Sequence, residues 1–186
     1  MFLFRIILYS CLIIFSGCST SATPAKPNLD QLVYNPASMT KTLQSLGDNL
    51  SVQVLETGVQ KHNYVRISAI KLADTPVIAA ISQTKLKNKM FKDIIANADV
   101  TPIGTMLFAP NSLIKRRNGM QISQVKLSSI KNPVIVKYLS GLGYTDSDTI
   151  IQRSSQFYYQ EQTLDLIEYV LPSINRFLSP PITLTK

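Results

Sequence analysis

Two charged residues, Arg66 and Glu168, lie inside segments whose apolar pattern predicts β-strands. Arg66 shares one face of the predicted strand Tyr64–Leu72 with Tyr64, Ser68 and Ile70, and Glu168 shares a strand face with Leu166 in the apolar run Leu164–Leu171. An arginine offers a fork of N–H donors that matches a carboxylate. A carboxylate in an apolar segment is either exposed or buried with a partner, because burial alone is costly. The two residues are therefore either surface charges or parts of a ligand site.

The residue types that usually carry catalysis or hold metals are scarce in this chain of 186 residues. It has one His, His62, and two Cys, Cys11 and Cys18. A zinc site or a His-activated nucleophile needs more than this, so we expect no disulfide framework, no metal site and no His-dependent mechanism. The chain contains no P-loop and no G-x-G-x-x-G, which predicts no nucleotide cofactor. The net charge of +8 favours anionic partners, although we interpret the basic run Lys115–Arg117 as a solvated surface.

The N-terminal residues predict an export signal rather than a fold element. Ile6–Phe15 is an apolar run, too short for the roughly 20 residues of a membrane-spanning helix. The Ser16-Gly17-Cys18 sequence that follows resembles a bacterial lipobox, which implies that residues 1–17 are a signal peptide and that Cys18 is lipidated. The alternative is a plain signal anchor with an accidental Cys.

The residues after Cys18 indicate a tether and a membrane location. Residues 18–28 are rich in Ser, Thr and Pro and are expected to be flexible. Ser19 resembles the residue found at this position in lipoproteins sorted to the outer membrane. We therefore expect a protein lipid-anchored to the bacterial membrane, at the outer membrane facing the periplasm.

The remainder of the chain reads as one α+β domain over residues 29–178, with a C-terminal tail at 179–186. The strands that the apolar patterns predict are Leu50–Leu55, Tyr64–Leu72, Val77–Thr84, Leu113–Leu127, Thr149–Tyr159 and Leu164–Leu171. The predicted helices are Ser38–Gly47, Lys87–Ala98 and Pro133–Leu142. The order has no alternation of strand and helix, which favours a single antiparallel sheet.

Four segments between about residues 34 and 172 resemble chorismate lyase, the enzyme that splits chorismate into 4-hydroxybenzoate and pyruvate. They are Ser38–Lys41 with Ser51–Gly58, the strand around Arg66 with Asp74-Thr75-Pro76, Thr101–Gly104 with Leu107-Phe108, and Arg153–Ser155 with Leu166–Pro172. The resemblance implies one antiparallel sheet of six strands, with helices as flaps over an enclosed ligand pocket.

The resemblance also implies roles for particular residues. Arg66 would pair with the ligand carboxylate, Glu168 would hold the ring hydroxyl or ether side, and backbone groups near Met39 and Ile103 would complete the pocket. Arg66 and Glu168 would then be the catalytic residues. The reaction needs no metal or cofactor, because loss of pyruvate aromatises the ring and the protein mainly has to hold the reactive conformation.

Several positions depart from the pattern of the family. A second Arg is replaced by Ile81, the Arg after the small-Pro-x-Gly motif is replaced by Thr105, and Lys115 stands where the family tends to have Arg. The usual doubled Arg is Arg153-Ser154, and residues 118–151 look like an insertion. These departures predict a pocket with less positive charge.

The sequence therefore predicts a chorismate lyase-like lipoprotein of ubiquinone biosynthesis. Its expected partners are a small aromatic carboxylate, the membrane through the lipid anchor and an envelope protein, with no nucleic acid. The alternative is a non-catalytic envelope lipoprotein of the same fold, which binds a small aromatic acid or joins an envelope assembly.

Overall fold

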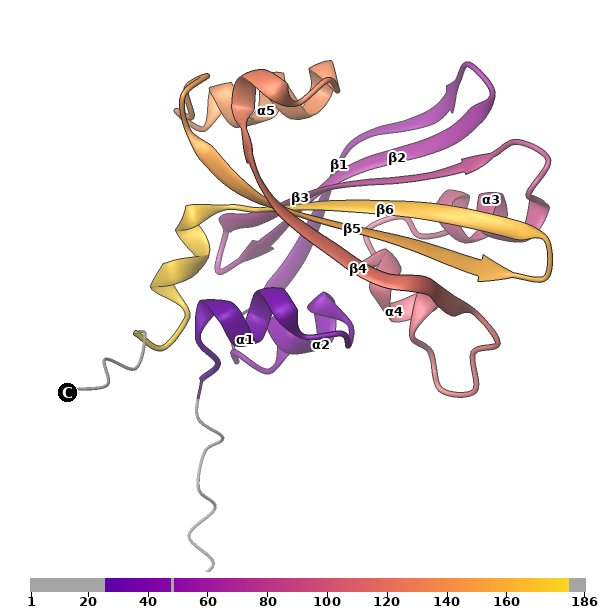
Figure 1. Ribbon diagram of the computed structural model, residues 1–186, viewed down its shortest axis with the longest axis horizontal. Helices are drawn as coiled ribbons and strands as arrows, with labels where there is room; N and C mark the ends of the chain where they lie inside the picture. The colour runs from indigo at the N-terminus through magenta and orange to yellow at the C-terminus, as the bar shows by residue number, and fades with distance from the viewer. Residues whose placement is uncertain (1–25, 48, 181–186) are drawn as a thin grey trace, which may run out of the picture.

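The computed structural model describes residues 26–47 and 49–180, which form one sheet with helices packed on both faces (Figure 1). The six strands lie in the order β1-β2-β3-β6-β5-β4, and every neighbouring pair is antiparallel. In chain order they are β1 (Leu50–Gln60), β2 (Asn63–Leu72), β3 (Thr75–Lys85), β4 (Lys115–Lys126), β5 (Thr149–Tyr159) and β6 (Gln162–Val170). The predicted α+β class with a single antiparallel six-stranded sheet is confirmed.

Three of the strand connections are two-residue turns with positive backbone φ. Lys61, Asp74 and Gln160 have φ values of 55°, 63° and 52°, the conformation that matches the twist of the flanking strands. The turn between β2 and β3 is Ala73-Asp74, one residue earlier than the predicted Asp74-Thr75-Pro76. Pro76 instead lies near the start of β3, beside a register shift, where a missing N–H donor is tolerated.

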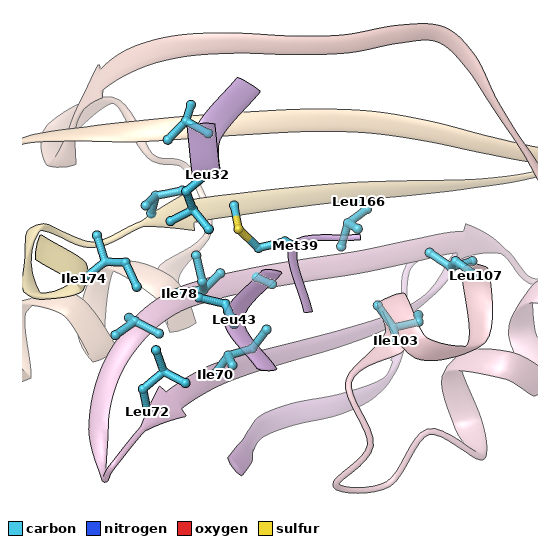
Figure 2. Close-up of a cluster of buried hydrophobic side chains, with 14 of the residues drawn as sticks. Leu32, Met39, Leu43, Ile70, Leu72, Ile78, Ile103, Leu107, Leu166 and Ile174 are labelled. Carbon is cyan, nitrogen blue, oxygen red and sulfur yellow. The ribbon is translucent and has the colours of Figure 1, made fainter. Parts of the chain in front are cut away.

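One face of the sheet is covered by five short helical segments. They are α1 (Leu29–Tyr34), α2 (Met39–Gln44), α3 (Lys89–Ala96), α4 (Ile103–Leu107) and the 3-10 helix η2 (Pro172–Arg176). Their apolar side chains, among them Leu43, Ile103 and Ile174, pack on Ile70 and Ile78 of the sheet (Figure 2). This layer is the larger part of the hydrophobic core, and it encloses the polar site described below.

Helix α1 was not predicted: Leu29, Leu32 and Val33 have helical spacing, but six residues are too few to distinguish a helix by its period. Its start is set by Asn28, whose side chain accepts a hydrogen bond from the Gln31 backbone while the Gln31 side chain accepts one from the Asn28 backbone. This reciprocal capping box satisfies donors that a short helix otherwise leaves free.

The other face of the sheet is covered over part of its length by η1 (Leu127–Ser129) and α5 (Pro133–Gly141). Ile135 and Leu139 of α5 pack on Ile67 and Ile81 of the sheet. The segment 118–151, interpreted above as an insertion, thus supplies most of β4, this helical cover and the start of β5.

The predicted signal peptide (residues 1–17), Cys18 and most of the tether lie outside the described residues, as do residues 181–186 of the predicted tail. None of the helices within the described residues has the length and apolar character needed to cross a bilayer.

Candidate functional site

Polar side chains gather on the sheet face that the larger helical layer covers. Arg66 and Ser68 alternate with aliphatic residues along β2, and the same alternation brings Glu168 of β6 and Arg153 of β5 to this face. Glu168 pairs directly with Arg153 on one side and with Ala80 on the other. All four polar side chains are buried. A cluster of charges is therefore built into the interior of the domain.

A cavity lies between this polar cluster and helices α2 and α4. Its lining comprises Ser38, Met39, Thr40, Val52, Arg66, Ser68, Ile70, Ala80, Pro102, Ile103, Gly104, Phe108, Arg116, Leu166 and Glu168. The four residues predicted to bind the ligand, Arg66, Met39, Ile103 and Glu168, are thus brought together at one place. The free volume is only about 20 Å³, room for about one water molecule. Anything larger fits only if the lining residues rearrange.

The side chain of Arg66 is held by the loop that precedes α4. Its Nη2 donates to the carbonyl oxygens of Asp99 at 2.6 Å and Thr101 at 3.1 Å. Within the described residues, its buried Nε has no hydrogen-bond partner. Burial lowers the pKa of the Arg66 guanidinium, and the nearby Asp99 carboxylate opposes this. One donor of a buried cation is therefore left available to a ligand.

Arg153 and Glu168 form a buried ion pair on the floor of the site. The Nη1 of Arg153 lies 3.5 Å from Oε2 of Glu168. The guanidinium also donates from Nε to the Met120 sulfur at 2.9 Å and from Nη2 to the Asn35 carbonyl at 3.2 Å. Burial raises the pKa of Glu168, an effect that Arg153 and Arg116 only partly offset. Burial likewise lowers the pKa of Arg153.

Arg116 is a third cation at the site, and the sequence interpretation missed it. Its guanidinium lies 5.2 Å from the ring centroids of both Phe108 and Phe157. Its Nη1 donates to the Pro36 carbonyl at 2.6 Å. The interpretation of Lys115–Arg117 as a solvated run is therefore wrong for Arg116, although Lys115 and Arg117 are exposed. The sequence feature that could have revealed this is the alternation of Ile114 and Arg116, which puts the arginine on the apolar face of the strand.

Two of the positions where the sequence departs from the family pattern, Ile81 and Thr105, have side chains that point away from the cavity. Ile81 faces the opposite side of the sheet and packs in the core under α5. Thr105 is exposed on α4. The cavity lining holds two cations, Arg66 and Arg116, and Arg153 pairs with the Glu168 carboxylate that lines the same cavity. A pocket with less positive charge than in the family stays a prediction.

Comparison with known proteins finds similarity in solved structures only: no family model and no curated protein matches. A gene product from Staphylococcus aureus, SA0254, matches with a TM-score of 0.51 and 15% identity, over 75% of this chain and 90% of that chain. The C-terminal domain of a histidine utilization repressor from Pseudomonas syringae matches with a TM-score of 0.47 and 6% identity, over 74% and 100%. A GntR-family transcriptional regulator from Bacillus cereus matches at 0.43 and 11%, over 73% and 99%. At these identities the likeness concerns the fold alone.

These findings correct the assignment to the chorismate lyase family. Among the matching structures described here, those with a stated role are transcriptional regulators or part of one, and no family model matches. The prediction of a lyase that forms 4-hydroxybenzoate for ubiquinone biosynthesis is therefore wrong, and its catalytic roles for Arg66 and Glu168 are not carried forward.

The predicted partners are corrected together with the function. The comparisons give no support to a lipid anchor or an envelope partner, and the named structures with a stated role belong to transcriptional regulators, so the partner set and the alternative of an envelope lipoprotein are withdrawn. Cys18 itself lies outside the described residues, so its modification and the location at the outer membrane stay predictions from the sequence.

Proposed function

We propose that this domain is a non-enzymatic ligand-binding domain that takes up a small oxyanion between the sheet and helices α2 and α4. The observation that supports this is a set of three arginines at one place: Arg66 and Arg116 line the cavity together with Glu168, and Arg153 is buried in an ion pair with Glu168. Arginine stays protonated in proteins, so three positive charges face two carboxylates, that of Glu168 beside Arg153 and Arg116 and that of Asp99 near Arg66. Buried charges are stabilised by partners of opposite sign, and an anionic ligand would supply them.

The lining of the cavity favours a carboxylate or a phosphate over a simple halide. Guanidinium groups hold both oxyanions by two parallel hydrogen bonds. The hydroxyls of Ser38, Thr40 and Ser68 line the same cavity and can donate to further oxygens. Apolar groups of Met39, Ile70 and Leu166 supply the remaining surface. Ligand pockets commonly combine such an apolar wall with a few placed polar groups.

The small free volume of the cavity supports a regulatory use of binding. A ligand of several atoms does not fit in about 20 Å³, so in this proposal the lining rearranges on binding, with α2 or α4 shifting away from the sheet. Binding would then stabilise one arrangement of the helical layer over another, which is how a ligand changes the state of a protein.

The test is thermal unfolding of the full-length chain with acetate, succinate, inorganic phosphate, chloride or glucose. A ligand that binds only the folded state raises its stability by an amount that grows with concentration, about 2.7 kcal/mol at 100 times Kd. We expect a carboxylate or phosphate to raise Tm for the wild type and for the exposed control Arg117→Gln, and not for Arg66→Gln. If no oxyanion raises Tm, or if both variants respond alike, the proposal is wrong.

A further inference from the structure

The loop between α3 and α4 is fastened to the sheet through Arg66. The two carbonyls that accept from Arg66 Nη2, those of Asp99 and Thr101, both belong to residues 97–102. Asp99 takes a φ of +38°, a left-handed conformation that Asp tolerates better than most non-glycine residues. The two hydrogen bonds from the buried guanidinium are therefore the observed support of this loop.

The geometry of a guanidinium puts this fastening in direct competition with a ligand. A carboxylate or phosphate can grip an arginine by two parallel bonds along the Nε–Nη2 edge or along the Nη1–Nη2 edge. Both edges use a hydrogen of Nη2. The two hydrogens of Arg66 Nη2 are directed to the two loop carbonyls. A two-point grip on Arg66 therefore requires at least one carbonyl to be released, whereas a single contact at the free Nε does not.

The loop continues directly into α4, and α4 is packed tightly on α2. A Cβ placed on Gly104 of α4 would lie 2.8 Å from the Thr40 hydroxyl oxygen and 3.0 Å from that of Ser38. At this contact the two helices are closely packed, with no free space between them. Movement of residues 97–102 is thus passed to α4 and from α4 to α2, the two helices that close the cavity.

We propose that Arg66 is a latch: it fastens residues 97–102 to the sheet, and an oxyanion that grips its fork releases that loop together with α4. The inference rests on the proposed function for its ligand, and it adds how binding would be transmitted. A halide, which offers no second oxygen, occupies the Nε side without opening the latch.

Hydrogen exchange of backbone amides in the full-length protein tests the latch. The reporters are Thr101, Thr105 and Phe108, whose N–H groups donate to Ala98, Pro102 and Gly104. We expect Arg66→Gln without ligand to speed their exchange by about tenfold or more, as for loss of hydrogen bonds to a charged group. Arg117→Gln should leave them unchanged. Acetate or phosphate, whichever calorimetry finds to bind the wild type, should speed the same amides, and chloride should not.

The outcomes separate this inference from the proposed function. If an oxyanion binds but the three amides exchange at an unchanged or slower rate, the latch is overturned while the binding function stands. If no oxyanion binds, the proposed function fails, and the latch is judged by Arg66→Gln: faster exchange confined to residues 97–108 supports it, and unchanged exchange overturns it. If Arg66→Gln unfolds globally, the exchange rates of the three amides in the wild type are compared with oxyanion and with chloride. Faster exchange with the oxyanion supports the latch, and equal rates overturn it.

Discussion

Arg153 and Glu168 are direct cross-strand partners whose charged groups lie 3.5 Å apart, and both are almost wholly buried. Each is the principal compensating charge for the other, because little of either side chain is exposed to water. A buried pair of this kind resists the loss of one member far more than a surface pair does. The pair also links β5 and β6 next to the cavity, so the loss of the pair can be measured as a fall in the free energy of unfolding.

Replacing Glu168 by Ala removes the carboxylate and leaves Arg153 buried without its ion-pair partner. We expect the free energy of unfolding to fall by about 3–5 kcal/mol, measured by urea denaturation. Glu161→Ala, at an exposed turn position, is the control and should change stability by about 0.5 kcal/mol or less. Equal effects of the two variants would contradict the buried pair.

The raised pKa of Glu168 predicts how stability depends on pH. Burial lifts the folded-state pKa above the ordinary value of 4.5, so the folded protein binds this proton more tightly than the unfolded chain. The resulting stabilisation is fully present below the unfolded-state pKa and is lost as pH rises through the folded-state pKa. In urea denaturation across this range, wild type should lose stability relative to Glu168→Gln as pH increases. The opposite slope would mean that Arg153 and Arg116 outweigh burial.

Gly104 should tolerate no side chain, because α4 lies against α2 at this point. In Gly104→Ala the new Cβ would meet the Thr40 hydroxyl at 2.8 Å, and we expect a loss of about 1–3 kcal/mol from overpacking. Adding Thr40→Ala should recover part of this loss, since the clashing atom is gone. Gly141→Ala is the matched control: it has open space around it and should be neutral or stabilising by up to about 1 kcal/mol. Additive effects at 104 and 40 would contradict the contact.

Arg116 and Arg117 are adjacent in sequence but differ in their expected contributions. Arg116→Ala removes a cation held between two aromatic rings and should cost about 1–2 kcal/mol. Arg117→Ala removes a cation that lies 5.5 Å from the Tyr158 ring at an exposed position, and should cost about 0.5 kcal/mol or less. Chemical denaturation measures the free energy of unfolding of the two variants. A larger loss of stability for Arg117→Ala than for Arg116→Ala would contradict the assignment of Arg116 as the residue that faces inward.

The strands and their faces could be predicted from the sequence because they depend on local alternation. The predicted strand Thr149–Tyr159 coincides with β5, and the predicted faces of Arg66 and Glu168 are those that line the cavity. Period-two patterns report burial without reference to distant residues. The fold class and the faces of Arg66 and Glu168 followed from these patterns, whereas their assignment to a ligand site came from the family resemblance.

The remainder of the site could not be predicted, because it is made by contacts between distant segments. Arg116 is buried by Phe157, 41 positions along the chain, and Arg153 by the Asn35 carbonyl, 118 positions away. No local pattern encodes such pairs. The near closure of the cavity likewise depends on how α4 docks at Gly104. The lyase assignment failed for a related reason: short matching motifs report a shared fold, and a fold does not determine function.

The central claim, an oxyanion site that depends on the fork of Arg66, is tested most directly by calorimetric titration of the full-length protein with acetate and with inorganic phosphate. The decisive variant is Arg66→Lys, which keeps the charge but loses the two-point grip, with Arg117→Lys as control. We predict that wild type and control bind at least one oxyanion equally well and that Arg66→Lys binds it about tenfold more weakly or worse, a difference of about 1.4 kcal/mol. Binding to Arg66→Lys as tight as to wild type, or no binding of either oxyanion to wild type, would contradict the claim.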